Sequence, residues 1–89
     1  MRLPSETVTQ VPTVTVTIAA IMRSAEFKRG LDDARKGIPF DWRIDEWNYE
    51  RGRLFAYVAP VSMPLWIGRK LNERAIALYR AASERGLII

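Results

Sequence analysis

The chain has 89 residues, a formal net charge of +4, and neither cysteine nor histidine. This length suits one domain with a thin core, and 48% hydrophobic residues is typical of a folded chain. The missing cysteine and histidine exclude disulfides, thiolate metal sites and the usual general base. Because no apolar run approaches the roughly 20 residues of a membrane span, we expect a cytoplasmic protein without metal or cofactor.

Arginine dominates the positive charge, accounting for eleven of the fourteen basic residues. The forked guanidinium group binds phosphates and carboxylates and stacks on aromatic rings. An arginine-rich balance therefore favours polyanionic partners such as RNA or DNA. The alternative is a solvated basic surface that binds no such partner.

The N-terminal region divides into a polar stretch and an alternating one. Residues 1–10 are polar and predict a loose tail. Thr13–Ile18 alternate threonine with β-branched apolar residues, which predicts a half-buried strand. A lone strand leaves its edges unpaired, so it would pair with LFAYVAPV, with GLII, or with a second copy in a homodimer through residues 13–18. Alternatively, Ile18 to Met22 form the first turn of the next helix, with Thr17 as its cap.

Three later segments carry helix spacing together with start and stop signals. We therefore expect a mostly α protein, in which the short strand is followed by three helices within a single domain covering residues 1–89. The expected start and stop residues are Ser24 and Gly37 for the first helix, Asp41 or Asp45 and Pro60 for the second, and Asn72 and Gly86 for the third. The residues between Val61 and Gly68 are expected to form an apolar connector.

A short pattern occurs twice, as FKRGLDDA from Phe27 and as YERGRLFA from Tyr49. In both copies an aromatic residue, a glycine and an alanine lie at i, i+3 and i+7, which is one stripe of a helix. Glycine inside a helix costs about 1 kcal/mol relative to alanine. Its repetition predicts that the first two helices form an antiparallel pair, with Gly30 against Gly52 and the neighbouring arginines at the rim. Chance similarity is the alternative.

Arginines alternate with aromatic residues between Trp42 and Arg53, which is the combination that single-stranded RNA binding requires. A second basic cluster precedes the third helix, where free backbone amides could hold a phosphate. Each feature has an alternative interpretation. Trp47 can be a core residue, which we favour, and the arginines can pair with nearby carboxylates. The second basic cluster can be a solvated face. The candidate nucleic-acid-binding residues are Arg29, Arg43, Arg51, Arg53, Arg69, Lys70 and Arg74, and the candidate partner-binding residues are Trp42, Trp47 and Trp66.

No catalytic constellation is present in the sequence. Asp32 and Asp33 are adjacent, so their side chains diverge on a helix and cannot share a substrate. The serines have no histidine to activate them. We therefore expect a protein that is not an enzyme.

The central third of the chain carries a family pattern. Arg29-Gly30 is followed by Gly37 and Ile38-Pro39-Phe40, and then by Trp47 and Gly52 in the next helix. In these features residues 26–57 resemble the ribosome modulation factor family, which has two short glycine-rich helices joined by a turn with a Pro-aromatic pair. The resemblance implies binding to ribosomal RNA on the small subunit and silencing of translation. The strand and the third helix have no counterpart there.

Two functions follow as expectations. The first is a small basic, non-catalytic binding module that contacts RNA or a ribosomal or nucleoprotein surface and regulates it. The second is an inhibitor of the phage or mobile-element type, which would occlude a host protein complex through apolar surface residues such as Trp42, Trp66 and Leu87 to Ile89. A structural homodimer without a ligand is a third possibility.

Overall fold

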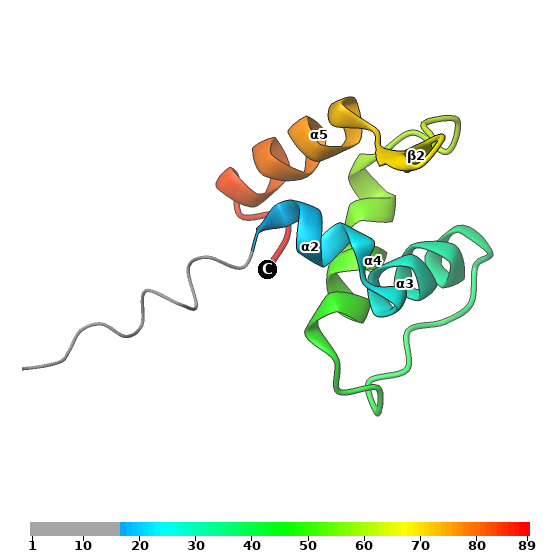
Figure 1. Cartoon of the computed structure of the whole chain (residues 1–89). Coiled ribbons are helices and arrows are strands. Elements are labelled where there is room, and N and C mark those ends of the chain that lie inside the picture. The colour runs from blue at the N-terminus through cyan, green and yellow to red at the C-terminus, as the bar shows by residue number, and fades with distance from the viewer. Residues whose placement is uncertain (1–16) are drawn as a thin grey trace, which may run out of the picture.

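The computed structural model describes residues 17–89 (Figure 1). This part of the protein is mostly helical, as expected, and includes one small two-stranded sheet. The predicted tail, and residues 13–16 of the predicted strand, lie outside the described residues. The elements are α2 (Ile18–Arg23), α3 (Ala25–Arg35), α4 (Trp47–Val58), β2 (Trp66–Ile67), β3 (Lys70–Leu71) and α5 (Glu73–Glu84).

Helix α2 replaces the end of the predicted strand. Ile18, the last residue of the alternating run, is the first residue of α2. The Thr17 hydroxyl accepts a hydrogen bond from the Ala20 amide at 3.1 Å, so Thr17 caps this helix. Ile21 and Met22 are buried, and their helical spacing brings both into the core. The Thr17 cap of the alternative interpretation is confirmed, but α2 ends at Arg23 and is a helix separate from α3. Residues 17–89 therefore contain four helices instead of three.

The predicted ends of α3 and α5 are confirmed. The Ser24 hydroxyl accepts from the Phe27 amide at 3.1 Å and caps α3, while the Asn72 side chain caps α5. Gly37 and Gly86 follow the two helices with φ of 76° and 77°. Glycine adopts this left-handed conformation without the strain that a Cβ would cause, which is why it stops helices at this position.

The predicted cap of α4 is wrong. Neither Asp41 nor Asp45 starts this helix; the Glu46 side chain does so by accepting from the Asn48 amide at 2.9 Å. Asp41 instead accepts hydrogen bonds from Arg43 in the preceding turn. The carboxylate of Asp41 is therefore occupied by Arg43 in this turn and does not cap α4.

Helices α3 and α4 meet at the two repeated glycines. A Cβ at Gly30 would collide with the backbone carbonyl of Tyr49, and a Cβ at Gly52 would collide with that of Phe27. Each glycine thus lies against the backbone of the aromatic residue that opens the other copy of the repeat. The predicted close approach of the backbones is confirmed, and it explains why both helices contain a residue that weakens them.

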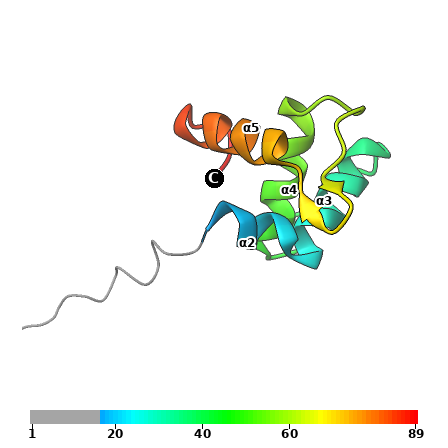
Figure 2. The same ribbon diagram turned by 45° about the horizontal axis from the view of Figure 1, so that its top comes forward.

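The antiparallel arrangement expected of this pair is wrong. The guanidinium of Arg35, the last residue of α3, donates to the carbonyl oxygen of Pro60 just beyond the end of α4, at 3.1 Å. Figures 1 and 2 show the two helices crossing with their carboxyl ends on the same side. The connection over residues 36–46 therefore returns along the pair to reach the start of α4.

The core is built around three aromatic rings from three helices. Phe27, Phe55 and Tyr79 lie 5.6 to 6.0 Å apart between ring centroids, in tilted arrangements that favour aromatic contact. Ala75 lets α5 come close to this cluster, and Ile88 near the C-terminus is also buried. Helix α5 and the C-terminal residues therefore pack against the crossing helices α3 and α4.

A hairpin lies where the sequence predicted only a connector. Trp66 pairs with Leu71 and Ile67 with Lys70 in the antiparallel strands β2 and β3. Gly68 turns the chain between them with a φ of 65°, the conformation that two-residue hairpin turns require. The hairpin presents its turn, with Arg69, away from the core.

Candidate nucleic-acid interface

Arg53 of α4 anchors the connection between α3 and α4, residues 36–46. Its guanidinium donates to the Ile38 carbonyl oxygen at 2.8 Å and lies 5.6 Å from the centroid of the Phe40 ring. Only 7% of Arg53 is exposed. A buried cation needs hydrogen-bond partners and polarisable neighbours to offset its lost hydration, and Arg53 finds both in this connection.

A chain of hydrogen bonds extends from Arg53 to α3. The Arg53 guanidinium donates to the Tyr49 hydroxyl at 3.3 Å, and that hydroxyl donates to the Asp33 carboxylate at 2.9 Å. Tyr49 is itself buried. The sequence placed Arg53 among the surface residues for nucleic acid, but the structure places it inside, where its guanidinium joins α3, α4 and the connection.

The turn of residues 41–44 displays Trp42. The Asp41 carboxylate accepts from the backbone amide of Arg43 at 3.0 Å and from its guanidinium at 2.9 and 3.1 Å, and the Asp41 carbonyl accepts from the Ile44 amide. These hydrogen bonds, with a smaller effect of the nearby Arg29 charge, lower the pKa of Asp41. Trp42, between the two bonded residues, is 79% exposed.

Trp47 begins α4 and also faces solvent. It is 62% exposed, which contradicts the core position favoured from the sequence. The guanidinium of Arg51 lies 6.0 Å from its ring, one helical turn on. Arg51 also donates to the Ile89 carbonyl oxygen and to Asn48, at 2.9 Å in both cases, so it links the outer side of α4 to the C-terminal residues.

Arg29 adds a further cation from α3. Its guanidinium lies 5.7 Å from the centroid of the Tyr49 ring and 3.9 Å from the Asp33 carboxylate, and its side chain is 66% exposed. A pair at this distance and exposure is weak, so the Arg29 cation remains accessible to an anion. The Arg29 charge also makes a small contribution to the lowered pKa of Asp41 in the 41–44 turn.

The remaining predicted cations lie elsewhere. Arg69 and Lys70 are exposed on the hairpin, and Arg74 is exposed in the first turn of α5. Figure 1 shows the hairpin and the start of α4 at opposite sides of the molecule. Trp66 is half-buried and packs against the core. The predicted residues therefore form two groups, of which only the group at the start of α4 combines cations with exposed tryptophans.

This first group is the candidate interface, and we call it the α4 entry surface. Its aromatic side chains are exposed, and its cations come from α3, from the 41–44 turn and from α4 itself. The residues that define it are Arg29, Trp42, Arg43, Trp47 and Arg51.

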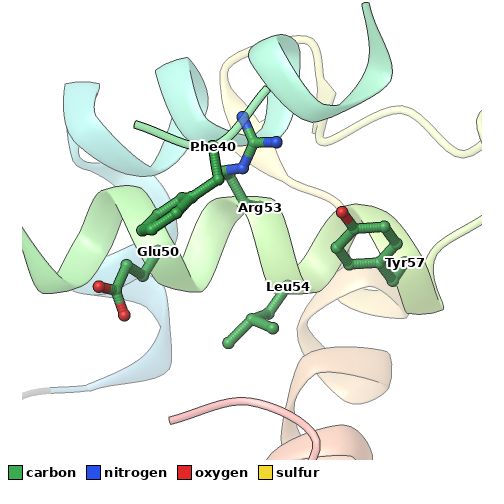
Figure 3. A pocket seen from close by; sticks show the side chains of 5 residues that line it. All are labelled: Phe40, Glu50, Arg53, Leu54 and Tyr57. Atoms are coloured by element: carbon green, nitrogen blue, oxygen red, sulfur yellow. The ribbon is translucent and has the colours of Figure 1, made fainter. Parts of the chain in front are cut away.

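A hollow beside this surface was missed from the sequence. Figure 3 shows Glu50 and Phe40 toward one end, Tyr57 at the other, and Arg53 and Leu54 between them. The hollow is partly open to solvent and has a volume of about 240 Å³. The only signal for it was the spacing of Glu50, Leu54 and Tyr57 at i, i+4 and i+7, which marks one stripe of α4.

A metal site and a membrane-spanning helix are both absent from residues 17–89. Residues 17–89 contain no group of three or more acidic side chains placed to hold a metal ion. Within the same residues, none of the helices has the length and apolar character needed to cross a membrane. Comparison with known protein families, curated protein sequences and solved structures finds no significant match to this chain.

Proposed function

We propose that this protein is a small, basic, non-catalytic binding module of the cytoplasm that contacts RNA, free or on a ribosomal or nucleoprotein surface, and regulates it. The α4 entry surface is the proposed contact. The observation that carries this proposal is that Trp42 and Trp47 are exposed, each beside a cation. Arg43 follows Trp42 in the turn, and the Arg51 guanidinium lies 6.0 Å from the Trp47 ring.

The chemistry of this surface suits unpaired nucleotides. Exposed rings can stack on bases, and arginines can pair with the phosphates between them. The Trp42 ring lies in a turn that the Asp41–Arg43 hydrogen bonds hold together, so it is presented without a large loss of conformational freedom on binding. The resemblance of residues 26–57 to the ribosome modulation factor family supports the same partner.

The salt dependence of RNA binding tests this proposal. We expect the affinity for a single-stranded RNA of mixed sequence to fall linearly with salt on a logarithmic scale, with a slope of about −0.7 per phosphate contact. Replacing Arg29 and Arg43 by glutamine should make the slope shallower by about 1.4. Fluorescence anisotropy over a series of salt concentrations measures it, and sedimentation with small ribosomal subunits extends it to the ribosome.

The matched control uses Arg80 of α5 and Arg85 at the C-cap of that helix, neither of which belongs to the α4 entry surface. Arg80 and Arg85 are both exposed, so Arg80→Gln with Arg85→Gln removes the same charge from another place. This variant should keep the slope of the unchanged protein. Equal slopes for the two double variants, or no binding of RNA and ribosomal subunits at low salt, would contradict the proposal.

A second candidate function rests on an apolar groove. A hollow of about 530 Å³ lies between α4 and α5, and nearby Val61 is 77% exposed. The lining of this hollow includes Val58, Met63 and Leu78, together with Arg74. Apolar surface of this kind is typical of contacts with proteins. An inhibitor that occludes a host protein complex would use this side. In that case a defined protein should co-purify, RNA should not displace it, and Leu78→Glu should release it.

A further inference from the structure

The hollow on α4 is built from both apolar and charged groups. The Phe40 and Tyr57 rings and the Leu54 side chain supply apolar surface, and Glu50 and Arg53 supply the only charges in its lining. Tyr57 is 75% exposed and Phe40 is 43% exposed, so both rings remain open to a ligand. Stacking surface and opposite charges are thus available within one hollow (Figure 3).

Its size selects a small ligand. The volume of about 240 Å³ is below the range of about 300–1,000 Å³ that is usual for drug-sized molecules. A flat ring system of the size of one nucleobase suits such a hollow, whereas a whole nucleotide would leave its sugar and phosphate outside. The phosphate would then be free to reach the cations of the α4 entry surface.

Glu50 is a free hydrogen-bond acceptor. Within residues 17–89 its carboxylate has no ion-pair partner and accepts no side-chain hydrogen bond. It is nevertheless half-buried, so its hydration is incomplete. A ligand with two adjacent N–H donors would satisfy both carboxylate oxygens at once.

Arg53 supplies the complementary donors. Two contacts of its guanidinium, to Tyr49 and Ile38, use part of its five N–H groups. Its remaining N–H groups have no other partner within residues 17–89. Because the same cation lines this site, a lysine or arginine side chain of a protein partner would be repelled, and a neutral ligand with both donors and acceptors is favoured.

We propose that this hollow binds an unpaired guanine base of RNA. Guanine presents adjacent N1–H and N2–H donors to the Glu50 carboxylate, and its O6 and N7 acceptors suit the Arg53 guanidinium. Adenine and cytosine offer the carboxylate a single amino group, and uracil a single ring N–H, so each would leave one carboxylate oxygen unpaired. This inference rests on the proposed RNA binding and adds to it a preference for one base.

The experiment compares RNA octamers of uridine that carry guanosine, adenosine or cytidine at one central position. The unchanged protein should bind the guanosine octamer about tenfold more tightly than the others, in fluorescence anisotropy at constant salt. Glu50→Gln retains the shape of the side chain but loses one acceptor, and it should abolish this preference. Glu84→Gln removes the same charge from an exposed position on α5 and should retain the preference.

Each outcome has a distinct meaning. If all octamers bind equally to the unchanged protein, or if Glu50→Gln keeps the preference, the guanine site is wrong while the proposed RNA binding stands. If no octamer and no mixed RNA binds, both fail together. N-acetyl-arginine amide tests the alternative of a site for cationic side chains. The guanine assignment would be overturned if this compound displaced the guanosine octamer from the unchanged protein and equally from Glu84→Gln, but not from Glu50→Gln.

A second variant tests the stacking surface. Tyr57→Ala removes an exposed ring without opening the core, so the fold should be retained. We expect this change to weaken binding of the guanosine octamer about tenfold and that of the uridine octamer much less. Equal losses on both octamers would contradict a base in the hollow.

Discussion

Gly30 of α3 lies directly against the backbone of Tyr49 in α4, with no space for a Cβ between them. The reciprocal contact joins Gly52 to the backbone of Phe27. The glycine of each repeat therefore lies against the aromatic residue of the other repeat. This exchange brings the two helices into backbone contact and sets where the connection that carries Trp42 must run.

Replacing either glycine by alanine should destabilise the protein. At an open helix position this change gains up to about 1 kcal/mol. At Gly30 or Gly52 the new methyl group would meet backbone atoms that cannot move aside, and we expect a loss of about 2 kcal/mol or more in the free energy of unfolding. Urea denaturation followed by circular dichroism measures it.

The control for this prediction is Ser83→Ala. Ser83 is exposed on α5, so alanine there should leave the stability unchanged or raise it slightly. Increased stability of Gly30→Ala would show that the two helices can separate at low cost and would contradict the close crossing.

The helix ends of this protein were predictable because they depend on local backbone chemistry. Ser24 and Asn72 supply side-chain oxygens to free amides, and Gly37 and Gly86 take a positive φ. These requirements act within a few residues, so the sequence displays them directly. The close approach at Gly30 was likewise visible, because a costly residue recurred at the same place in two helices.

The direction of the helix pair and the inner face of α4 were not predictable in this way. Helix α4 carries apolar residues on two sides: Tyr49 and Phe55 are buried, while Trp47 and Tyr57 are exposed. Spacing alone cannot tell which stripe meets the core. Arg53 adds to the difficulty, since charged residues are expected outside and its partners lie in a connection distant in sequence.

Arg53→Met should weaken the anchoring of the 36–46 connection. The substitution retains the apolar stem but removes the donors to the Ile38 carbonyl and the Tyr49 hydroxyl. Hydrogen bonds from a charged group contribute about 1.5–3 kcal/mol, so we expect the free energy of unfolding to fall by about 2–3 kcal/mol. Hydrogen exchange should also become faster in this connection. Arg80→Met, at an exposed site, is the control and should change stability by less than about 0.5 kcal/mol.

Trp42→Ala and Trp47→Ala should each reduce RNA affinity without reducing stability. A ring stacked on a base contributes about 1–3 kcal/mol, and both tryptophans are exposed. Anisotropy titrations and thermal unfolding of the same samples separate the two effects. Val61→Ala, an exposed apolar site after α4, should leave RNA affinity unchanged. A loss of stability of about 3–5 kcal/mol in Trp47→Ala would instead indicate a core residue.

Tyr79 should make the protein less stable in alkali. Burial raises the pKa of its phenol, although the nearby Arg51 charge opposes this shift. The folded state therefore favours the neutral phenol, and its contribution is complete below about pH 10, where tyrosine in the unfolded chain ionises. As the pH rises above this value toward the pKa of the folded state, the contribution is lost. Tyr79→Phe should show a smaller fall in the free energy of unfolding between pH 9 and 11.

The same measurement distinguishes Tyr79 from the other tyrosines. Tyr57→Phe alters a ring that is 75% exposed and should leave the pH dependence as it is. Arg51→Gln removes the opposing charge, so it should raise the pKa of Tyr79 further and steepen the loss at high pH. Urea titrations at each pH give these slopes. Identical slopes for Tyr79→Phe and the unchanged protein would show that the phenol ionises as easily in the folded core as in the unfolded chain.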